Sequence, residues 1–194
     1  HTLTTNPEEA DVLVVNTCSF IEDSRKESID TILEAAELKK SGSCRKLIVT
    51  GCLAERYPKE IESDLVEVDA ILGTNQVEEI ARAVSGEQIA PPDTFGRSNA
   101  DLYLYSDATP RTLIGPRYSA YIKISEGCDH ACAFCVIPKI RGRLRSRSID
   151  SIVREAERLA SEGVREITLI SQDTTSYGKD LGMRDGLAAL LQAL

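Results

Sequence analysis

Short apolar runs alternate with amphipathic segments along most of the chain. Helical periodicity, with apolar residues at i, i+3, i+4 and i+7, predicts helices over 19–40, 75–84, 152–160 and 184–194. Runs of strand type lie between them, at 11–16, 46–50, 70–73, 119–125 and 166–171. Strands that alternate with helices at this spacing predict an α/β protein with parallel sheets.

Two helices carry a clear apolar stripe. In the first, which we expect to end at Gly42, the predicted stripe consists of Ile29, Ile32, Leu33 and Ala36. In the helix over 152–160, which we expect to end at Gly163, the predicted stripe consists of Ile152, Val153, Ala156, Leu159 and Ala160. We expect both stripes to pack against a sheet.

The periodicity breaks over 85–116, which holds four of the seven prolines. We interpret this stretch as a linker with a short strand at Leu102–Tyr105. The predicted organisation is an N-terminal parallel-sheet domain (1–85), a linker (86–116) and a second α/β unit (117–194).

The composition excludes several classes of protein. With 42% hydrophobic residues over 194 positions, the chain is neither a disordered tail nor a collagen-like fibre nor a small disulfide scaffold. A formal net charge of −8 argues against a general nucleic-acid binder. Neither a spanning apolar run nor a secretory signal is found, so we expect a cytoplasmic protein that does not contact a membrane. In that compartment six cysteines favour metal binding or catalysis over disulfides.

Five of the six cysteines follow predicted strands. In parallel α/β folds sites form at the carboxyl ends of strands. Cys18 and Cys52 each follow a strand of the first half, and Cys128, Cys132 and Cys135 follow the strand at 119–125. Cys44 precedes a strand, so we interpret it as incidental.

The spacing C-x₃-C-x₂-C of Cys128, Cys132 and Cys135 is the sharpest signal. Three thiolates on one short loop fit three corners of a 4Fe-4S cluster and leave one iron free for a substrate or cofactor. Zinc is the rival, with His130 as a fourth ligand, although His130 lies between two other ligands. Structural thiols without a metal are the third interpretation.

Two polar segments near this loop are candidates for ligand binding. Basic residues recur at every second position of 139–147, so an extended conformation would place Lys139, Arg141, Arg143, Arg145 and Arg147 on one side. This set is either an anion clamp, with Arg147 its main candidate, or a solvated edge. Ser171, Gln172 and Asp173 follow a strand and either bind the polar groups of a ligand or cap that strand.

The sequence resembles the radical S-adenosylmethionine (SAM) methylthiotransferases. The similar segments are NTCSFIEDSRKESID, VTGC, SEGCDHACAFCVIPKIRGRLRSR and ISQDTTSYG, which together span most of the chain. Within this family, AFC and SQD are closer to the enzymes that modify a ribosomal protein than to those that modify transfer RNA, which tend to show TYC and GQN.

The resemblance implies that 1–85 is a methylthiotransferase domain of Rossmann or flavodoxin-like type and that 117–194 is the first part of a radical SAM partial (β/α) barrel. It also implies two 4Fe-4S clusters. Cys128, Cys132 and Cys135 would hold the cluster that binds SAM, and Cys18 and Cys52 would supply two of three ligands of an auxiliary cluster. Phe134 and Ile137 match positions that pack the adenine of SAM, whereas Arg147 and the residues 171–173 remain candidates for its other groups. The third auxiliary ligand, in a GCPKN-like segment, and most of the barrel are not in this sequence, so we expect a fragment that is inactive by itself.

The resemblance also implies a reaction. One electron from the cluster cleaves SAM, the resulting 5′-deoxyadenosyl radical removes a hydrogen atom from an unactivated carbon, and sulfur and a methyl group are added there. The implied substrate is the β-carbon of an aspartate in small-subunit ribosomal protein S-twelve, with flavodoxin or ferredoxin as electron donor. The alternatives are methylthiolation of transfer RNA and, from another class, a non-catalytic iron–sulfur or zinc module.

Overall fold

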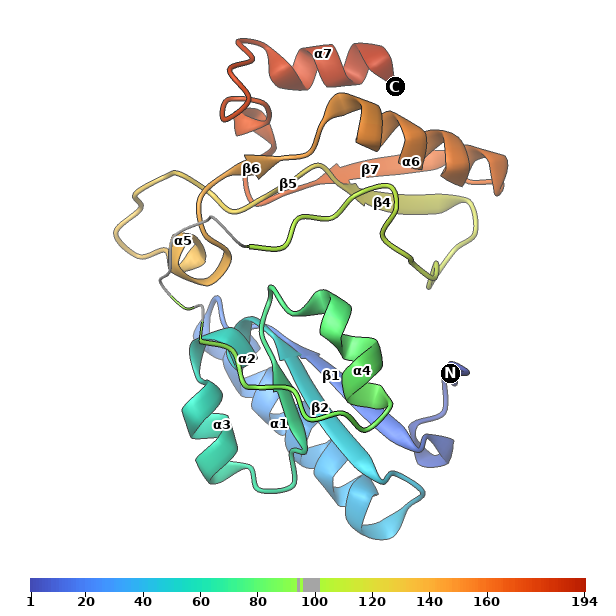
Figure 1. Ribbon diagram of the computed structural model, residues 1–194, viewed down its shortest axis with the longest axis vertical. Helices are drawn as coiled ribbons and strands as arrows, with labels where there is room; N and C mark the ends of the chain where they lie inside the picture. The colour runs from blue at the N-terminus through green and yellow to red at the C-terminus, as the bar shows by residue number, and fades with distance from the viewer. Residues whose placement is uncertain (94, 96–101) are drawn as a thin grey trace. The chain divides into compact units, whose positions relative to one another are not determined.

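The computed structural model describes residues 1–93, 95 and 102–194, and the chain forms two compact units, His1–Arg97 and Ser98–Leu194. Figure 1 shows a mixed α/β arrangement within each unit, which confirms the predicted fold class. The predicted three-part division of the chain stays a prediction, and positions 94 and 96–101 of its linker lie outside the described residues.

The first unit is built on a three-stranded parallel sheet in the order β1-β2-β3. Its strands are β1 (Val12–Thr17), β2 (Lys46–Gly51) and β3 (Ala70–Leu72). Its helices are η1 (Pro7–Glu9), α1 (Glu22–Ser41), α2 (Cys52–Arg56), α3 (Pro58–Asp64), η2 (Val77–Glu79) and α4 (Ile80–Val84). The sequence pattern missed α2 and α3, and it merged η2 with α4 into one helix.

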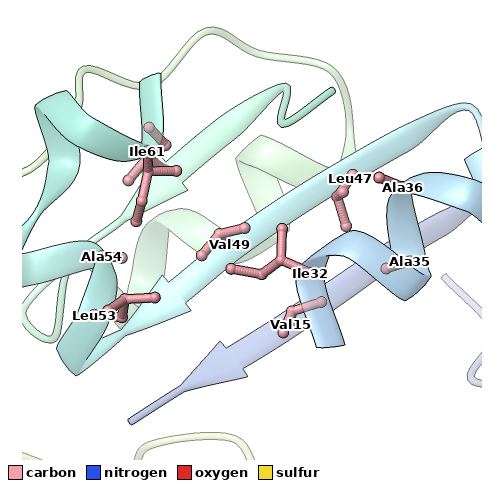
Figure 2. Packing of buried hydrophobic residues seen from close by; sticks show 10 residues of the cluster. Val15, Ile32, Ala35, Ala36, Leu47, Val49, Leu53, Ala54 and Ile61 are labelled. Atoms are coloured by element: carbon pink, nitrogen blue, oxygen red, sulfur yellow. The ribbon is translucent and has the colours of Figure 1, made fainter. Parts of the chain in front are cut away.

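Alternation along β2 divides the core of this unit between the two faces of the sheet. Leu47 and Val49 lie on the face that α1, α2 and α3 cover, and Figure 2 shows Ile32 of α1 pointing toward Val15 and Val49. Ile48 lies on the other face, in a cluster with Ala83 of α4. Each large aliphatic side chain buried in this way contributes about 1.5–3 kcal/mol to stability.

One predicted stripe needs correction. The buried residues of α1 are Ser28, Ile32, Ala35 and Ala36, whereas Leu33 is 46% exposed. Ile32 and Ala36 are buried as predicted and Ile29 packs against the same core, so only Leu33 was wrong. Ser28 is buried because its hydroxyl accepts from the Cys18 N–H (3.0 Å) and donates to the Cys18 carbonyl oxygen (2.9 Å).

The second unit pairs β4 (Ser119–Lys123) with β7 (Glu166–Ile170) in parallel and β5 (Ser125–Glu126) with β6 (Arg145–Ser146) in antiparallel. Its helices are α5 (Ile137–Arg141), α6 (Ile149–Ser161), η4 (Thr174–Ser176) and α7 (Gly186–Ala193). Ala120, Ile122 and Ile124 pack against Ile152 and Leu159 of α6.

Two predictions for this unit need correction. From the predicted α6 stripe, Ala160 is exposed and Val153 is only half-buried. The predicted strand at Leu102–Tyr105 is wrong, because these residues have no strand pairing.

Residues 103–111, which we call the strap, are bound to α6 by polar contacts. The Asp107 carboxylate accepts two hydrogen bonds from Arg154 (2.7 and 3.2 Å), and the Asp107 carbonyl oxygen accepts one from Arg158 (2.7 Å). The Asp107 N–H donates to the Ser151 hydroxyl at 3.1 Å. These hydrogen bonds from both the side chain and the backbone of Asp107 fix the strap, which has no regular secondary structure of its own.

Replacing Asp107 by Asn is expected to destabilise the second unit in a pH-dependent way. The pKa of the Asp107 carboxyl lies well below its usual range, chiefly because of a hydrogen bond from the Arg154 side chain and secondly because of the Ser151 side chain. Because the folded-state pKa is lowered, this stabilisation is present above the unfolded pKa of about 3.9 and is lost as the pH falls toward the folded value. Denaturant unfolding of wild type and Asp107→Asn should therefore differ at pH 7 and converge as the pH falls below about 4. A difference that stays constant over this range would contradict the prediction.

No helix among the described residues is long and apolar enough to span a bilayer.

Candidate functional site

The three-cysteine loop begins directly after β5 and ends at α5. Cys128, Cys132 and Cys135 therefore follow the carboxyl end of the β4 segment, as the sequence predicted. The Cys135 N–H donates to the Cys132 carbonyl oxygen at 3.0 Å, which closes a tight turn between these two cysteines. Cys132 is exposed, and Cys128 and Cys135 are half-buried.

Two glycines shape the start of this loop. Gly127 has φ +77°, and a Cβ there would lie 2.0 Å from the Arg143 carbonyl oxygen. Gly142 has φ +73°, and its carbonyl oxygen accepts the Cys128 N–H at 3.2 Å. The backbone before Cys128 thus runs against the backbone after α5 so closely that a side chain is excluded.

Gly127→Ala is expected to destabilise the second unit more than Gly163→Ala does. Both positions have positive φ, but nothing lies within 4 Å of a Cβ at Gly163. Gly163→Ala should therefore cost only the conformational term of about 1–2 kcal/mol, and Gly127→Ala about 1–3 kcal/mol more. The free energies of unfolding of the two variants measure this. Equal losses of unfolding free energy in the two variants would show that the backbone around Arg143 moves away from an added Cβ at no cost, which would contradict the prediction.

The three cysteines of this loop fit a cluster better than a single ion. All six cysteines of the chain are free thiols. Among the described residues, Cys132 and Cys135 do not join Cys128 in any set of donor atoms that lie within 4.8 Å of one another. A cubane cluster spreads its ligands over separate irons, so its thiolates do not need to converge on one point.

The residues after β7 support the loop. The Gln172 Oε1 atom accepts the Gly127 N–H at 2.8 Å, and the Asp173 Oδ2 atom lies 2.8 Å from the His130 Nε2 atom. Asp173 also accepts from Thr175 N–H (3.1 Å), the Thr175 hydroxyl (2.7 Å) and the Ser176 hydroxyl (2.5 Å). Gln172 and Asp173 thus hold the loop at two points, through its backbone before Cys128 and through His130.

These hydrogen bonds also set the charge of Asp173. The pKa of its carboxyl lies well below the usual range because Ser176 and Thr175, and then His130, donate to the ionised form. Asp173 is therefore a carboxylate at neutral pH. Whether the residues 171–173 also contact a ligand stays a prediction.

The other predicted ligand contacts lie around the same loop. Phe134 is 88% exposed, and Ile137 is the first residue of α5. The Ser171 hydroxyl is buried and has no hydrogen-bond partner among the described residues. Binding of adenine by Phe134 and Ile137 stays a prediction, as does ligand binding by Ser171.

The basic run is not extended, so the expectation of five charges on one side is wrong. Residues 137–141 form α5, with Pro138 in its first turn, and Gly142 turns the chain with positive φ before β6. Arg141 pairs with the buried Glu126 at 2.8 Å.

Arg147 is buried in an ion-pair network. Its side chain is 2% exposed and lies 2.6 Å from Glu155. Its guanidinium also donates to the Lys123 carbonyl oxygen (2.9 Å) and to the Ser151 hydroxyl (3.0 Å). In this arrangement Arg147 holds the end of β4 against α6, and its predicted role in binding SAM stays untested.

Cys18 and Cys52 lie beside each other at the end of the first unit's sheet. Thr17 pairs with Gly51 in the parallel register, so each cysteine directly follows one member of this pair. The Ser19 hydroxyl donates to the Cys52 carbonyl oxygen at 3.1 Å, which joins the two chain segments. Cys18 is exposed and Cys52 is buried. Cys44 lies before β2, away from these two.

Gly51 makes this close approach possible. It has φ +99°, and a Cβ there would lie 2.5 Å from the Thr17 carbonyl oxygen. The Thr17 hydroxyl donates to the Thr50 carbonyl oxygen at 2.6 Å and accepts the Leu53 N–H at 3.3 Å. The start of α2, and with it Cys52, is therefore fixed to the end of β1.

Sequence reasoning missed several residues that shape the second unit. Glu126, Glu155 and Tyr177 are nearly buried, and the Tyr177 hydroxyl donates to the Arg147 carbonyl oxygen at 2.8 Å. Glu155 follows Ser151 by four positions, so both lie on the buried face of α6. Buried charges in an apolar stripe have no distinguishing sequence pattern, whereas the glycine directly before Cys128 was a signal that could have been used.

Two family models match the chain. Residues 1–73 match an uncharacterized protein family, UPF0004, and residues 122–191 match the radical SAM superfamily. The second range includes the whole three-cysteine loop and the residues 171–173.

Several relatives in sequence are ribosomal protein uS12 methylthiotransferases, RimO. The protein of Solibacter usitatus is 57% identical over 194 residues, which is 100% of this chain and 40% of that protein. The proteins of Koribacter versatilis and Myxococcus xanthus are 47% and 49% identical, over 99% and 100% of this chain and 46% and 40% of their own lengths. The chain thus spans less than half the length of these relatives.

Solved structures show the same fold at low identity. The methyltransferase TsrM of Kitasatospora setae, determined with tryptophan and a SAM analogue, has a TM-score of 0.58 and 17% identity over 93% of this chain and 39% of its own. A second structure of TsrM, with cobalamin and a [4Fe-4S] cluster, has a TM-score of 0.57 and 16% identity over 95% of this chain and 40% of its own.

Proposed function

We propose that the chain belongs to the radical SAM methylthiotransferase family, and that the protein it forms part of adds a methylthio group to the β-carbon of an aspartate in ribosomal protein uS12. The observation that carries the proposal is the three-cysteine loop, placed after β5 within the range that matches the radical SAM superfamily. The RimO name of the relatives supports the substrate.

In this proposal Cys128, Cys132 and Cys135 hold a 4Fe-4S cluster and leave one iron to bind SAM. The bound cluster supplies the electron that cleaves SAM. Gln172 and Asp173 keep the loop in place through Gly127 and His130. Phe134 offers an exposed aromatic ring for the adenine, with Ile137 beside it in sequence.

Cys18 and Cys52 would hold an auxiliary 4Fe-4S cluster together with a third ligand. Their adjacency at the ends of β1 and β2 supports this, because two thiols that follow paired residues can reach the same cluster. A reductant of flavodoxin or ferredoxin type would supply the electron, and we place the reaction in the cytoplasm, where ribosomal proteins are made.

Anaerobic reconstitution of the full-length protein, of which this chain forms part, with iron, sulfide and SAM tests the activity. After reduction the protein should release 5′-deoxyadenosine and, with uS12 as substrate, raise the mass of one aspartate by a methylthio group. Release of 5′-deoxyadenosine with modification of transfer RNA and not of uS12 would overturn the substrate. A colourless protein that binds zinc and does not cleave SAM would overturn the activity.

A further inference from the structure

Cys128 is part of a second set of donor atoms, which differs from the three-cysteine set. In the described residues, the Sγ atom of Cys128, a ring nitrogen of His130 and a carboxylate oxygen of Asp173 all lie within 4.8 Å of one another. Cys132 and Cys135 are not part of this set. These three donor atoms therefore surround one point, as the ligands of a single ion do.

The chemistry of the set suits a borderline divalent cation. One thiolate, one imidazole and one carboxylate are ligands that Zn²⁺, Fe²⁺ and Co²⁺ accept, and three protein ligands leave the fourth position for water. The side chain of His130 is 61% exposed and that of Asp173 is 16% exposed. Solvent and an incoming ion can reach the set from the side of His130.

The set is held in place by its neighbours. Thr175 and Ser176 fix the Asp173 carboxylate, and Asp173 in turn orients the His130 ring at 2.8 Å. Gln172 holds the backbone at Gly127, one residue before Cys128. Outer hydrogen bonds of this type orient ligands and raise metal affinity. Little rearrangement is needed for an ion to replace the hydrogen bond between His130 and Asp173.

We propose that Cys128, His130 and Asp173 bind a single divalent cation of the Zn²⁺ class whenever the loop carries no cluster. Binding releases the thiol proton of Cys128 to solvent, and the thiolate, the imidazole and the carboxylate each form one bond to the ion. Because Cys128 also belongs to the three-cysteine loop, the single ion and a cluster on that loop exclude each other. The single-ion site itself does not depend on the proposed function; only this competition does.

Cobalt titration of the cluster-free protein tests the site, since Co²⁺ reports its ligands through its absorption. The wild-type protein, kept anaerobic, should bind Co²⁺ with the absorption of a four-coordinate ion and a thiolate-to-cobalt band. His130→Ala should weaken this binding at least about tenfold, because it removes a ligand. Cys135→Ser is the matched control and should leave the affinity within about twofold, because Cys135 is not in the set. His130 is exposed, so its replacement leaves the core intact.

Competition with the cluster provides the second measurement. Zn²⁺ added first should slow cluster assembly in the wild type and have less effect in His130→Ala, which keeps all three cysteines. Cobalt binding that depends on Cys135 and not on His130 would overturn the single-ion site. If the site binds Co²⁺ as expected but no cluster forms on any variant, the proposed function fails and the site stands. If a cluster forms and cleaves SAM while His130→Ala binds Co²⁺ as tightly as the wild type does, the single-ion site is wrong and the proposed function stands.

Discussion

Cys132→Ser is expected to abolish reductive cleavage of SAM in the reconstituted full-length protein. Cys132 and Cys135 share a tight turn, and each supplies one of the three thiolates that the proposed cluster needs. Serine is a hard, weakly acidic oxygen ligand that does not replace a thiolate on iron. Since even outer residues around a metal site cost about 10–100-fold when they are replaced, loss of a direct ligand should lower the rate by at least about a hundredfold. The release of 5′-deoxyadenosine per reduced protein measures it.

Cys44→Ser is the control for this prediction. Cys44 is also a free thiol, but it is buried before β2, and its Sγ atom donates to the Lys46 carbonyl oxygen at 3.2 Å. A serine hydroxyl can make the same contact, so the iron content and SAM cleavage of Cys44→Ser should match those of the wild type. Cleavage that survives Cys132→Ser would show that the three-cysteine loop is not the cluster site.

Glu155→Ala is expected to lower the free energy of unfolding by about 3–5 kcal/mol, the usual cost of leaving a buried charge without its partner. The Glu155 carboxylate bridges two guanidinium groups, Arg111 at 2.8 Å and Arg147 at 2.6 Å. Arg147 is 2% exposed, so without Glu155 its charge stays buried without a counter-ion. Denaturant unfolding measures the loss.

Glu157→Ala is the matched control on the same helix. Glu157 is exposed, so its removal should change the stability by no more than about 0.5 kcal/mol. A double variant that also replaces Arg147 by a residue without charge should recover part of the loss, because the uncompensated charge is then gone. Losses of equal size in Glu155→Ala and Glu157→Ala would contradict the buried network.

The strands, the larger helices and the placement of the cysteines could be predicted because each depends on local pattern. The ends of β1 and β2 lie where the apolar runs end, and parallel pairing then brings Cys18 and Cys52 together. The burial of Ser28 could not be predicted, since apolar periodicity does not reveal that Ser28 is bound to the backbone of Cys18. Leu33 fits the periodicity as well as Ala35 does.

The environment of the three-cysteine loop was harder to predict than the loop itself. Basic residues at every second position suggested an extended segment over 139–147. Pro138 and Gly142, however, are the usual signals for the start and end of a helix. The role of Asp173 depends on His130, which lies 43 positions earlier. No periodicity in the sequence connects two such residues.

The strap also covers part of one edge of strand β4. β4 pairs with β7 on one side, and on its other side the carbonyl oxygens of Tyr121 and Lys123 already accept hydrogen bonds from Arg111 (2.8 Å) and Arg147 (2.9 Å). Exposed strand edges are the usual starting points of intermolecular β-pairing and fibril growth. With the Tyr121 and Lys123 carbonyl oxygens occupied by guanidinium groups, this edge of β4 is less open to intermolecular pairing in the folded unit.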